Sequence, residues 1–238
     1  MTVSALHVLI SGGFTGAYEA LLPEFERASG VAVTTGSGAS QGSGPHTISA
    51  QLARGVPADV VILSREGLAE LVAANRIAAE TALDLASVGL GIAVRAGAPK
   101  PDLGSVDAVK RALLKARIVA IPGSTSGIWL KTDLFPRLGV ADALDVKMMP
   151  RGSDASALVA AGGAGIAVMP VSEILVAPGV DLAGALPPQI QMIQVFAAAA
   201  VAGASAMATA RQLIAFLASP HAAEAIRRSG MEPVTAAR

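Results

Sequence analysis

Glycine and hydroxyl residues recur at four places where an apolar run gives way to a helical pattern. Glycine lets the backbone approach a ligand closely, the free N–H groups of a first helical turn point outward, and serine or threonine adds a neutral donor. One such segment alone is compatible with an ordinary helix cap and turn. Four at the same topological position favour a shared cleft that binds a small anion. The segments begin at Ser11 (SGGFT), Gly36 (GSGASQGSG), Pro122 (PGSTSG) and Pro150 (PRGSD).

Other chemistries have weaker support. The phosphate-loop pattern GxxxxGK[ST] is absent because no lysine follows any of these glycines, and the GxSxG elbow of hydrolases is also missing. A Ser-His-Asp hydrolase would have to recruit His46 without a supporting motif. The chain has no cysteine, which excludes thiolate zinc sites, and its three histidines are too scattered to indicate a metal cluster. We therefore expect neither a metal nor another cofactor.

The charge balance limits the partners. Lysine and arginine together number 18, as do aspartate and glutamate, so the formal net charge is zero. No basic surplus exists to neutralise a phosphate backbone, which argues against nucleic acid as a partner. A small anion needs only a few local donors. Of Arg65, Arg95 and Arg151, which could each clamp a carboxylate, only Arg151 lies inside a strand-to-helix loop.

The elements that would position these residues follow an α/β pattern. Of the 238 residues 53% are hydrophobic but only 3% aromatic, which suits buried parallel strands covered by alanine-rich helices. Alternating strands and helices imply parallel strands with right-handed crossovers. Strands are predicted over 6–10, 31–35, 58–63, 89–95, 118–121, 146–149, 165–169 and 190–201, and helices over 15–29, 47–54, 64–75, 106–116, 126–138, 155–160, 205–217 and 221–229.

Two sets of strand-helix units predict two lobes. Because two helices follow the second set, residues 1–84 plus 190–238 are expected to form lobe I, with 88–182 inserted as lobe II. The crossing segments near 85–90 and 187–191 would be the hinges.

The N-terminal segment MTVSALHVLI has no basic n-region and no long apolar region, so no signal peptide is predicted. The chain as it stands is expected to be cytoplasmic, and periplasmic if a signal peptide was removed. The most apolar stretch, Gln194–Met207, is interrupted by Gly203 and is shorter than the ~20 residues that span a bilayer.

Four stretches in order resemble the successive signatures of the molybdate-binding proteins of bacterial transporters. They read LHVLISGGFTGAYEALLPEFERASGVAV, QLARGVPADVVILS, STSGIWLKTDLFPRLGV and SALVAAGGAGIAVMPVSEI, and the resemblance covers about residues 6–230. It implies a type II periplasmic-binding-protein fold, which is two-lobed and α/β with mostly parallel sheets and a ligand cleft between the lobes. For an exported protein it also implies a membrane transporter as partner.

The resemblance implies where an oxyanion would be held. The family's first-loop serine falls at or next to Gly13, its second-loop serine within 37–43, its backbone donors at Ser126 and near Ser153, and its tyrosine at Met169. A thioether cannot donate to a dry tetrahedral oxyanion, whereas the longer second loop and Arg151 suit a larger planar carboxylate. We therefore expect a small di- or tricarboxylate, or another oxyanion, as the ligand. The candidate ligand-binding residues are Ser11, Gly12, Gly13, Ser37, Ser40, Ser43, Ser124, Ser126, Arg151, Ser153 and Met169.

The SGGF start, the lengthened Gly/Ser loop with Pro45 before the next helix, and the STSG of 124–127 also resemble the aconitate isomerase subfamily of this fold. This resemblance implies movement of a proton along an allylic system in a tricarboxylate, which needs a positioned base. His46, at the exit of the Gly/Ser loop, is the candidate base, and a solvent-exposed loop histidine is the alternative. A carboxylate-binding protein, an isomerase and a cytoplasmic ligand sensor remain open as functions.

Overall fold

A computed structural model of the chain describes residues 5–234 and divides them into two units. Unit 1 contains the described residues up to Ser87 and from Val195, and unit 2 contains Val88–Gln194. The strands β4 and β9 each carry the chain across a boundary between the units. The predicted ends of lobe I at residues 1 and 238, and the start of the segment considered as a signal peptide, lie outside the described residues.

The sheet of unit 1 has the strand order β2-β1-β3-β9. Strand β1 is parallel to β2 and β3, whereas β9 is antiparallel to β3, so the sheet is mixed. The first part of β4 pairs with β10. The carboxyl ends of β1, β2 and β3 therefore share one edge. The strands are β1 (Leu6–Ile10), β2 (Val33–Ser37), β3 (Val60–Ser64), β4 (Leu83–Arg95), β9 (Ile193–Ala200) and β10 (Glu232–Pro233).

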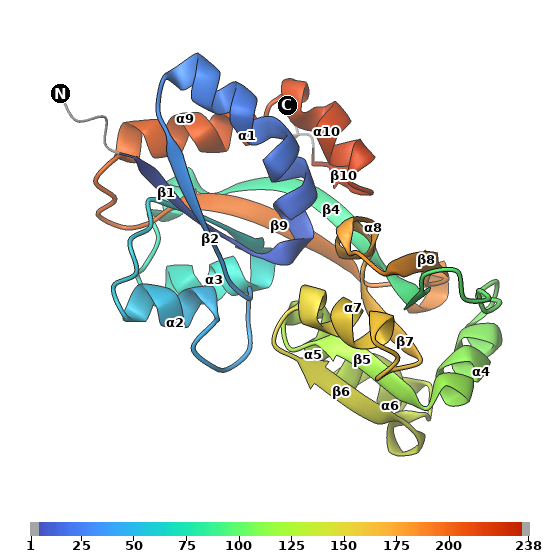
Figure 1. Cartoon of the computed structure of the whole chain (residues 1–238). Coiled ribbons are helices and arrows are strands. Elements are labelled where there is room, and N and C mark those ends of the chain that lie inside the picture. Colours follow the sequence, from blue (N-terminus) through green and yellow to red (C-terminus); the bar gives the residue numbers. More distant parts are fainter. Residues whose placement is uncertain (1–4, 235–238) are drawn as a thin grey trace. The chain divides into compact units, whose positions relative to one another are not determined.

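Helices cover both faces of this sheet (Figure 1). Helices α9 and α10 pack against α1 on one face, and α2 and α3 lie on the other. Strand alternation explains the second contact, because Leu9, Val61 and Leu63 join one buried cluster with apolar residues of α2 and α3. The helices are α1 (Thr15–Ser29), α2 (Ile48–Ala53), α3 (Arg65–Ala73), α9 (Met207–Leu217) and α10 (Ala223–Arg228).

The sheet of unit 2 is built around the parallel strands β6, β5 and β7, with the second part of β4 antiparallel to β7 and β8. Its elements are α4 (Val106–Ala116), β5 (Ile118–Pro122), α5 (Thr125–Trp129), a π-helical turn (Leu130–Leu134), α6 (Phe135–Arg137), β6 (Asp145–Met149), α7 (Gly152–Ala160), β7 (Ile166–Pro170), α8 (Val171–Val176) and β8 (Val180–Ala185).

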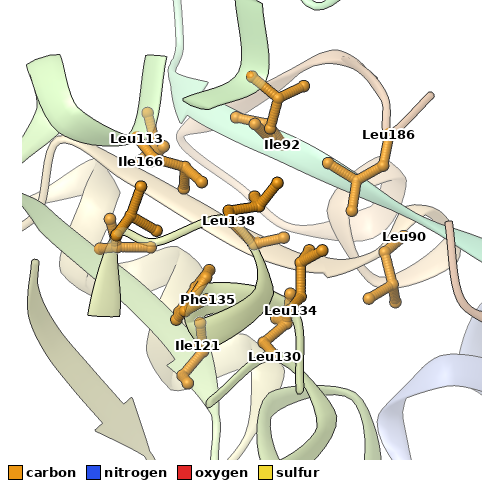
Figure 2. Packing of buried hydrophobic residues seen from close by; sticks show 14 of the residues in the cluster. Leu90, Ile92, Leu113, Ile121, Leu130, Leu134, Phe135, Leu138, Ile166 and Leu186 are labelled. Atoms are coloured by element: carbon orange, nitrogen blue, oxygen red, sulfur yellow. The ribbon is translucent and has the colours of Figure 1, made fainter. Parts of the chain in front are cut away.

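The two faces of this sheet carry side chains of different size. On one face, Leu90 and Ile92 of β4 and Ile121 of β5 pack in a cluster with Leu130 and Leu134, as Figure 2 shows. On the other face the strands present Ala93, Ala120 and Ala167, which cluster with apolar residues of α7 and α8. Small strand residues let these helices approach closely, so the turns that begin α7 and α8 lie close to the sheet.

Most predicted elements are confirmed, and two of the differences have local causes. The helix predicted over 126–138 contains a π-helical turn that ends at Leu134, two residues before Pro136 and its missing N–H. The second strand begins at Val33 rather than 31, because the Ser29 hydroxyl accepts from the Val31 N–H (3.2 Å). Helix α8 and strand β8 were not predicted, and β4 begins at Leu83 rather than 89.

The aspartate of the GVPAD motif ties unit 1 together. Asp59 is 3% exposed and lies just before β3. One carboxylate oxygen accepts from the backbone N–H of His7 at the start of β1 (2.9 Å). The other accepts from the Ser205 hydroxyl and the Ala206 N–H just before α9, both at 3.2 Å. Asp59 therefore joins β1 and β3 to the C-terminal helices.

We expect Asp59→Ala to lower the free energy of unfolding by about 2–3 kcal/mol, because it leaves buried donors without an acceptor. Asp84→Ala is the control, since Asp84 accepts from the exposed Arg65 at 3.1 Å, and a loss below about 1 kcal/mol is expected. Urea unfolding followed by circular dichroism measures both. Equal losses in the two variants would contradict a special role for Asp59.

Candidate functional site

Two of the predicted loops meet at the carboxyl edge of unit 1. The Ser11 N–H donates to the Ile62 carbonyl of β3 (2.8 Å), and the Gly38 N–H donates to the Ile10 carbonyl (2.9 Å). The Ser64 N–H at the end of β3 donates to the Ser40 hydroxyl (2.9 Å). The starts of the first and second loops therefore lie side by side, and the Ser40 hydroxyl keeps its own proton for donation.

The Ser11 hydroxyl has unused hydrogen-bonding capacity. Ser11 is 4% exposed, and its Oγ has no hydrogen-bond partner within the part of the chain that the structure describes. A buried polar group without a partner costs free energy, so such a group in a native protein calls for a functional explanation. Ser11 precedes the short helical turn Gly12–Phe14 that leads into α1. A ligand oxygen would satisfy this hydroxyl.

Gly13 has no room for a side chain. A Cβ at this position would lie 2.0 Å from Cζ of Phe196, whose ring from β9 fills the space. The family's serine at or next to this position therefore cannot be accommodated at Gly13 itself. Gly12 beside it is exposed, while Phe196 is 1% exposed.

The rest of the second loop is more exposed. Ser37 and Ser43 are exposed, and Gln51 holds the two ends of the loop by donating to the carbonyls of Ser37 (3.0 Å) and His46 (3.2 Å). The His46 ring is partly buried and packs against Gly44 of its own loop. Its role as a base stays a prediction.

Unit 2 brings the third and fourth loops together in the same way. The Gly123 N–H after β5 donates to the Met149 carbonyl at the end of β6 (2.6 Å). Ser126, in the first turn of α5, is 2% exposed, and Ser124 before it is partly buried. Ser153, in the first turn of α7, is exposed. These serines follow neighbouring parallel strands and so lie at one edge of the sheet.

Arg151, the residue before α7, already has an anionic partner in the first turn of that helix. Its Nε and Nη2 each donate to the Asp154 carboxylate at 3.1 Å. These hydrogen bonds and the charge of Asp154 raise the pKa of Arg151 further above its ordinary value. The side chain is about half exposed, and the Nη1 group remains available for a ligand.

Met169, where the resemblance places a tyrosine, is fully buried in the core that α7 and α8 cover. Its sulfur accepts from the Ser156 hydroxyl (3.4 Å). The methionine side chain is therefore part of this apolar core, and no hydroxyl donor replaces the tyrosine at this position.

Glu173, in the first turn of α8, was missed from the sequence. A Cβ on Gly152 would lie 1.8 Å from Glu173 Oε2 and 2.9 Å from Met169 Cε, so the carboxyl occupies the space that this glycine leaves free. Burial raises the pKa of Glu173 from its ordinary 4.5 to about 7. The neighbouring Ser172 is 2% exposed, and its Oγ has no partner among residues 5–234. The signal in the sequence was a carboxylate directly after a buried strand, at the same position as the Gly/Ser loops.

A surface hollow in unit 1 of about 490 Å³ lies elsewhere. It is lined by apolar residues of α3 and by the Arg65–Asp84 ion pair, and it contains none of the predicted ligand-binding residues.

Comparison with known proteins identifies the class. The family model described as bacterial extracellular solute-binding protein matches residues 6–232, and the chain belongs to this family. The chain is also 39% identical to an aconitate isomerase from a Pseudomonas species over 236 residues, which cover 98% of this chain and 90% of the relative.

Solved structures agree on the fold. The periplasmic molybdate-binding protein of Azotobacter vinelandii has a TM-score of 0.71 at 20% identity, with 95% of this chain and 98% of that chain covered. The sulfate-binding protein SubI of Mycobacterium tuberculosis H37Rv has a TM-score of 0.73 at 22% identity, covering 98% and 88%. The predicted α/β periplasmic-binding-protein fold is thereby confirmed.

Within the described residues, no helix is long and apolar enough to cross a membrane.

We expect Gly13→Ala to disturb the first loop, because the new methyl group would overlap the Phe196 ring. The overpacking should cost about 1–3 kcal/mol of stability. The double variant Gly13→Ala/Phe196→Leu should recover part of this loss, because the smaller side chain vacates the space. Thermal unfolding of both single variants and the double variant measures the coupling. Additive losses would show that the two residues do not compete for the same space.

Proposed function

We propose that the chain binds a small di- or tricarboxylate through donors at the carboxyl ends of the parallel strands in both units. The observation that carries this proposal is the buried Ser11 hydroxyl before the turn that leads into α1, which has no hydrogen-bond partner within residues 5–234. The Ser40 hydroxyl and the first turns of α5 and α7, which contain Ser126 and Ser153, supply further donors without a countercharge. That both units serve one ligand is part of the proposal.

The side chains near these donors favour carboxylates over tetrahedral oxyanions. Met169 offers no donor, whereas Arg151 keeps a free edge for a planar carboxylate. A hydrogen bond to a charged group contributes roughly 1.5–3 kcal/mol, so a missing donor weakens a tetrahedral oxyanion about ten- to a hundredfold. If the chain is exported, such a ligand could be passed to a membrane transporter, as in other solute-binding proteins.

A second candidate function is isomerisation of an aconitate-like acid. The observation that favours it is the 39% identity to an aconitate isomerase over nearly the whole chain. A binding protein and an isomerase on this fold need the same carboxylate donors, and the isomerase also needs a group that carries a proton. We propose aconitate as the acid to test first.

Ser11→Ala should weaken tricarboxylate binding about ten- to a hundredfold, because it removes a buried donor to a charged ligand. Isothermal titration calorimetry with aconitate, tricarballylate, molybdate and sulfate measures this loss. Ser49→Ala, at an exposed serine of α2, is the control and should bind as the unaltered protein does. Tight molybdate binding with no response to any carboxylate would reject the proposed ligand class.

Incubation with cis- or trans-aconitate in heavy water should yield the other isomer, with deuterium at the carbon next to the double bond. The physical reason is that an allylic shift exchanges a carbon-bound proton with a protein group in contact with solvent. Proton NMR follows both changes. Tight aconitate binding with neither isomerisation nor exchange would leave a binding protein or sensor as the function.

A further inference from the structure

The geometry of unit 2 places one carboxyl group at the edge where its other candidate donors lie. Strands β6, β5 and β7 are neighbours and parallel, so their carboxyl ends share that edge. Ser126 follows β5, Ser153 follows β6, and Glu173 follows β7. The contact between the Glu173 carboxyl and Gly152 joins the turn after β7 to the fourth loop.

Within the described residues, no cation pairs with this carboxyl, and it takes part in no hydrogen bond. At the start of α7, Asp154 pairs with the preceding Arg151 at 3.1 Å. On β8, Asp181 accepts from the Gly97 N–H (2.8 Å). Strand β7 carries no charged residue. The carboxyl is partly buried against Gly152 and Met169, where its charged form is poorly solvated.

We propose that Glu173 moves the proton between the methylene and vinyl carbons of an aconitate-like substrate, an inference that rests on the isomerase activity proposed above. Its location beside the first turn of α7 puts it next to backbone N–H groups that can hold a substrate carboxylate. His46, the base expected from the sequence, lies in unit 1 and packs on its own loop.

The reaction balances with this one group. The Glu173 carboxylate takes a proton from the methylene carbon, and the C–H electron pair spreads over the allylic system and the adjoining carboxylate. The resulting carboxylic acid returns a proton to the former vinyl carbon, so that one C–H bond breaks, one forms and the double bond moves. The conformation in which the methylene arm is bound sets the geometry of the new double bond. No oxidant, reductant or co-reactant is needed.

The titration of Glu173 suits this task. A group that both accepts and returns a proton works best when its pKa is near the working pH, and burial brings the pKa of Glu173 to about 7. In the folded protein the proton is bound more tightly than in the unfolded chain. The stability that Glu173 contributes is therefore present below its ordinary pKa of 4.5 and is lost as pH rises through about 7.

The test compares Glu173→Gln with the unaltered protein and with Asp107→Asn. Asp107 is the matched control, because it is an exposed carboxylate in the first turn of α4. Glu173→Gln should lower kcat for aconitate isomerisation by roughly 10²–10⁴, with affinity for aconitate unchanged or higher. Asp107→Asn should keep full activity, and Glu173→Asp should retain more turnover than Glu173→Gln.

Folding is checked on the same variants. Glu173→Gln should be at least as stable as the unaltered protein at pH 8, because it removes a poorly solvated charge. Lost activity together with a lower melting temperature at pH 8 would assign Glu173 a structural role and overturn the inference.

The remaining outcomes separate the two proposals. If Glu173→Gln keeps kcat within about tenfold of the unaltered protein, below the usual contribution of a proton-transfer group, the inference fails while the isomerase proposal stands. Loss of turnover in His46→Ala with full turnover in Glu173→Gln overturns it in favour of His46. If the unaltered protein binds aconitate without exchange or isomerisation, the isomerase proposal and the inference fall together.

Discussion

Close packing at two strand-to-helix turns is the constraint on which the candidate donors of both units depend. In unit 1 the Phe196 ring takes the place of a side chain on Gly13, and in unit 2 the Glu173 carboxyl takes that place at Gly152. A Cβ would overlap the buried Phe196 ring at Gly13, and at Gly152 it would have to displace the Glu173 carboxyl. The backbone N–H groups of the first helical turns can therefore face a ligand directly. The side chain that packs against each glycine influences what kind of ligand is held.

The two turns differ in the side chain that packs against the glycine. Phe196 is apolar and fixed, so the first loop depends on the Ser11 hydroxyl and on backbone donors. At Gly152 a titratable group stands in the same structural position. An ionised Glu173 repels an anionic ligand, whereas the protonated acid can donate to it, so ligand binding and protonation are coupled. A solute-binding fold can acquire proton-transfer chemistry in this way without a change in architecture.

Local patterns in the sequence predict much of this arrangement. The bounds of β1, α1 and α4 follow from hydrophobic periodicity and helix caps, which act within a few residues. The Gly/Ser loops could be predicted because, at the end of any strand, glycine allows close approach of the backbone and serine adds a donor. Glu173 was missed because an acidic residue in a first turn ordinarily complements the helix dipole. Its burial depends on contact with Gly152, which lies far from it in the sequence.

Proton uptake on ligand binding tests the central claim, that a carboxylate ligand binds beside Glu173, most directly. Calorimetric titration of tricarballylate at pH 8 in buffers of different ionisation enthalpy gives the number of protons taken up per ligand bound. A ligand carboxylate next to Glu173 raises the pKa of this group further, so net uptake of up to about one proton is predicted, and none in Glu173→Gln. Binding without proton uptake, or equal uptake in both proteins, would contradict the account.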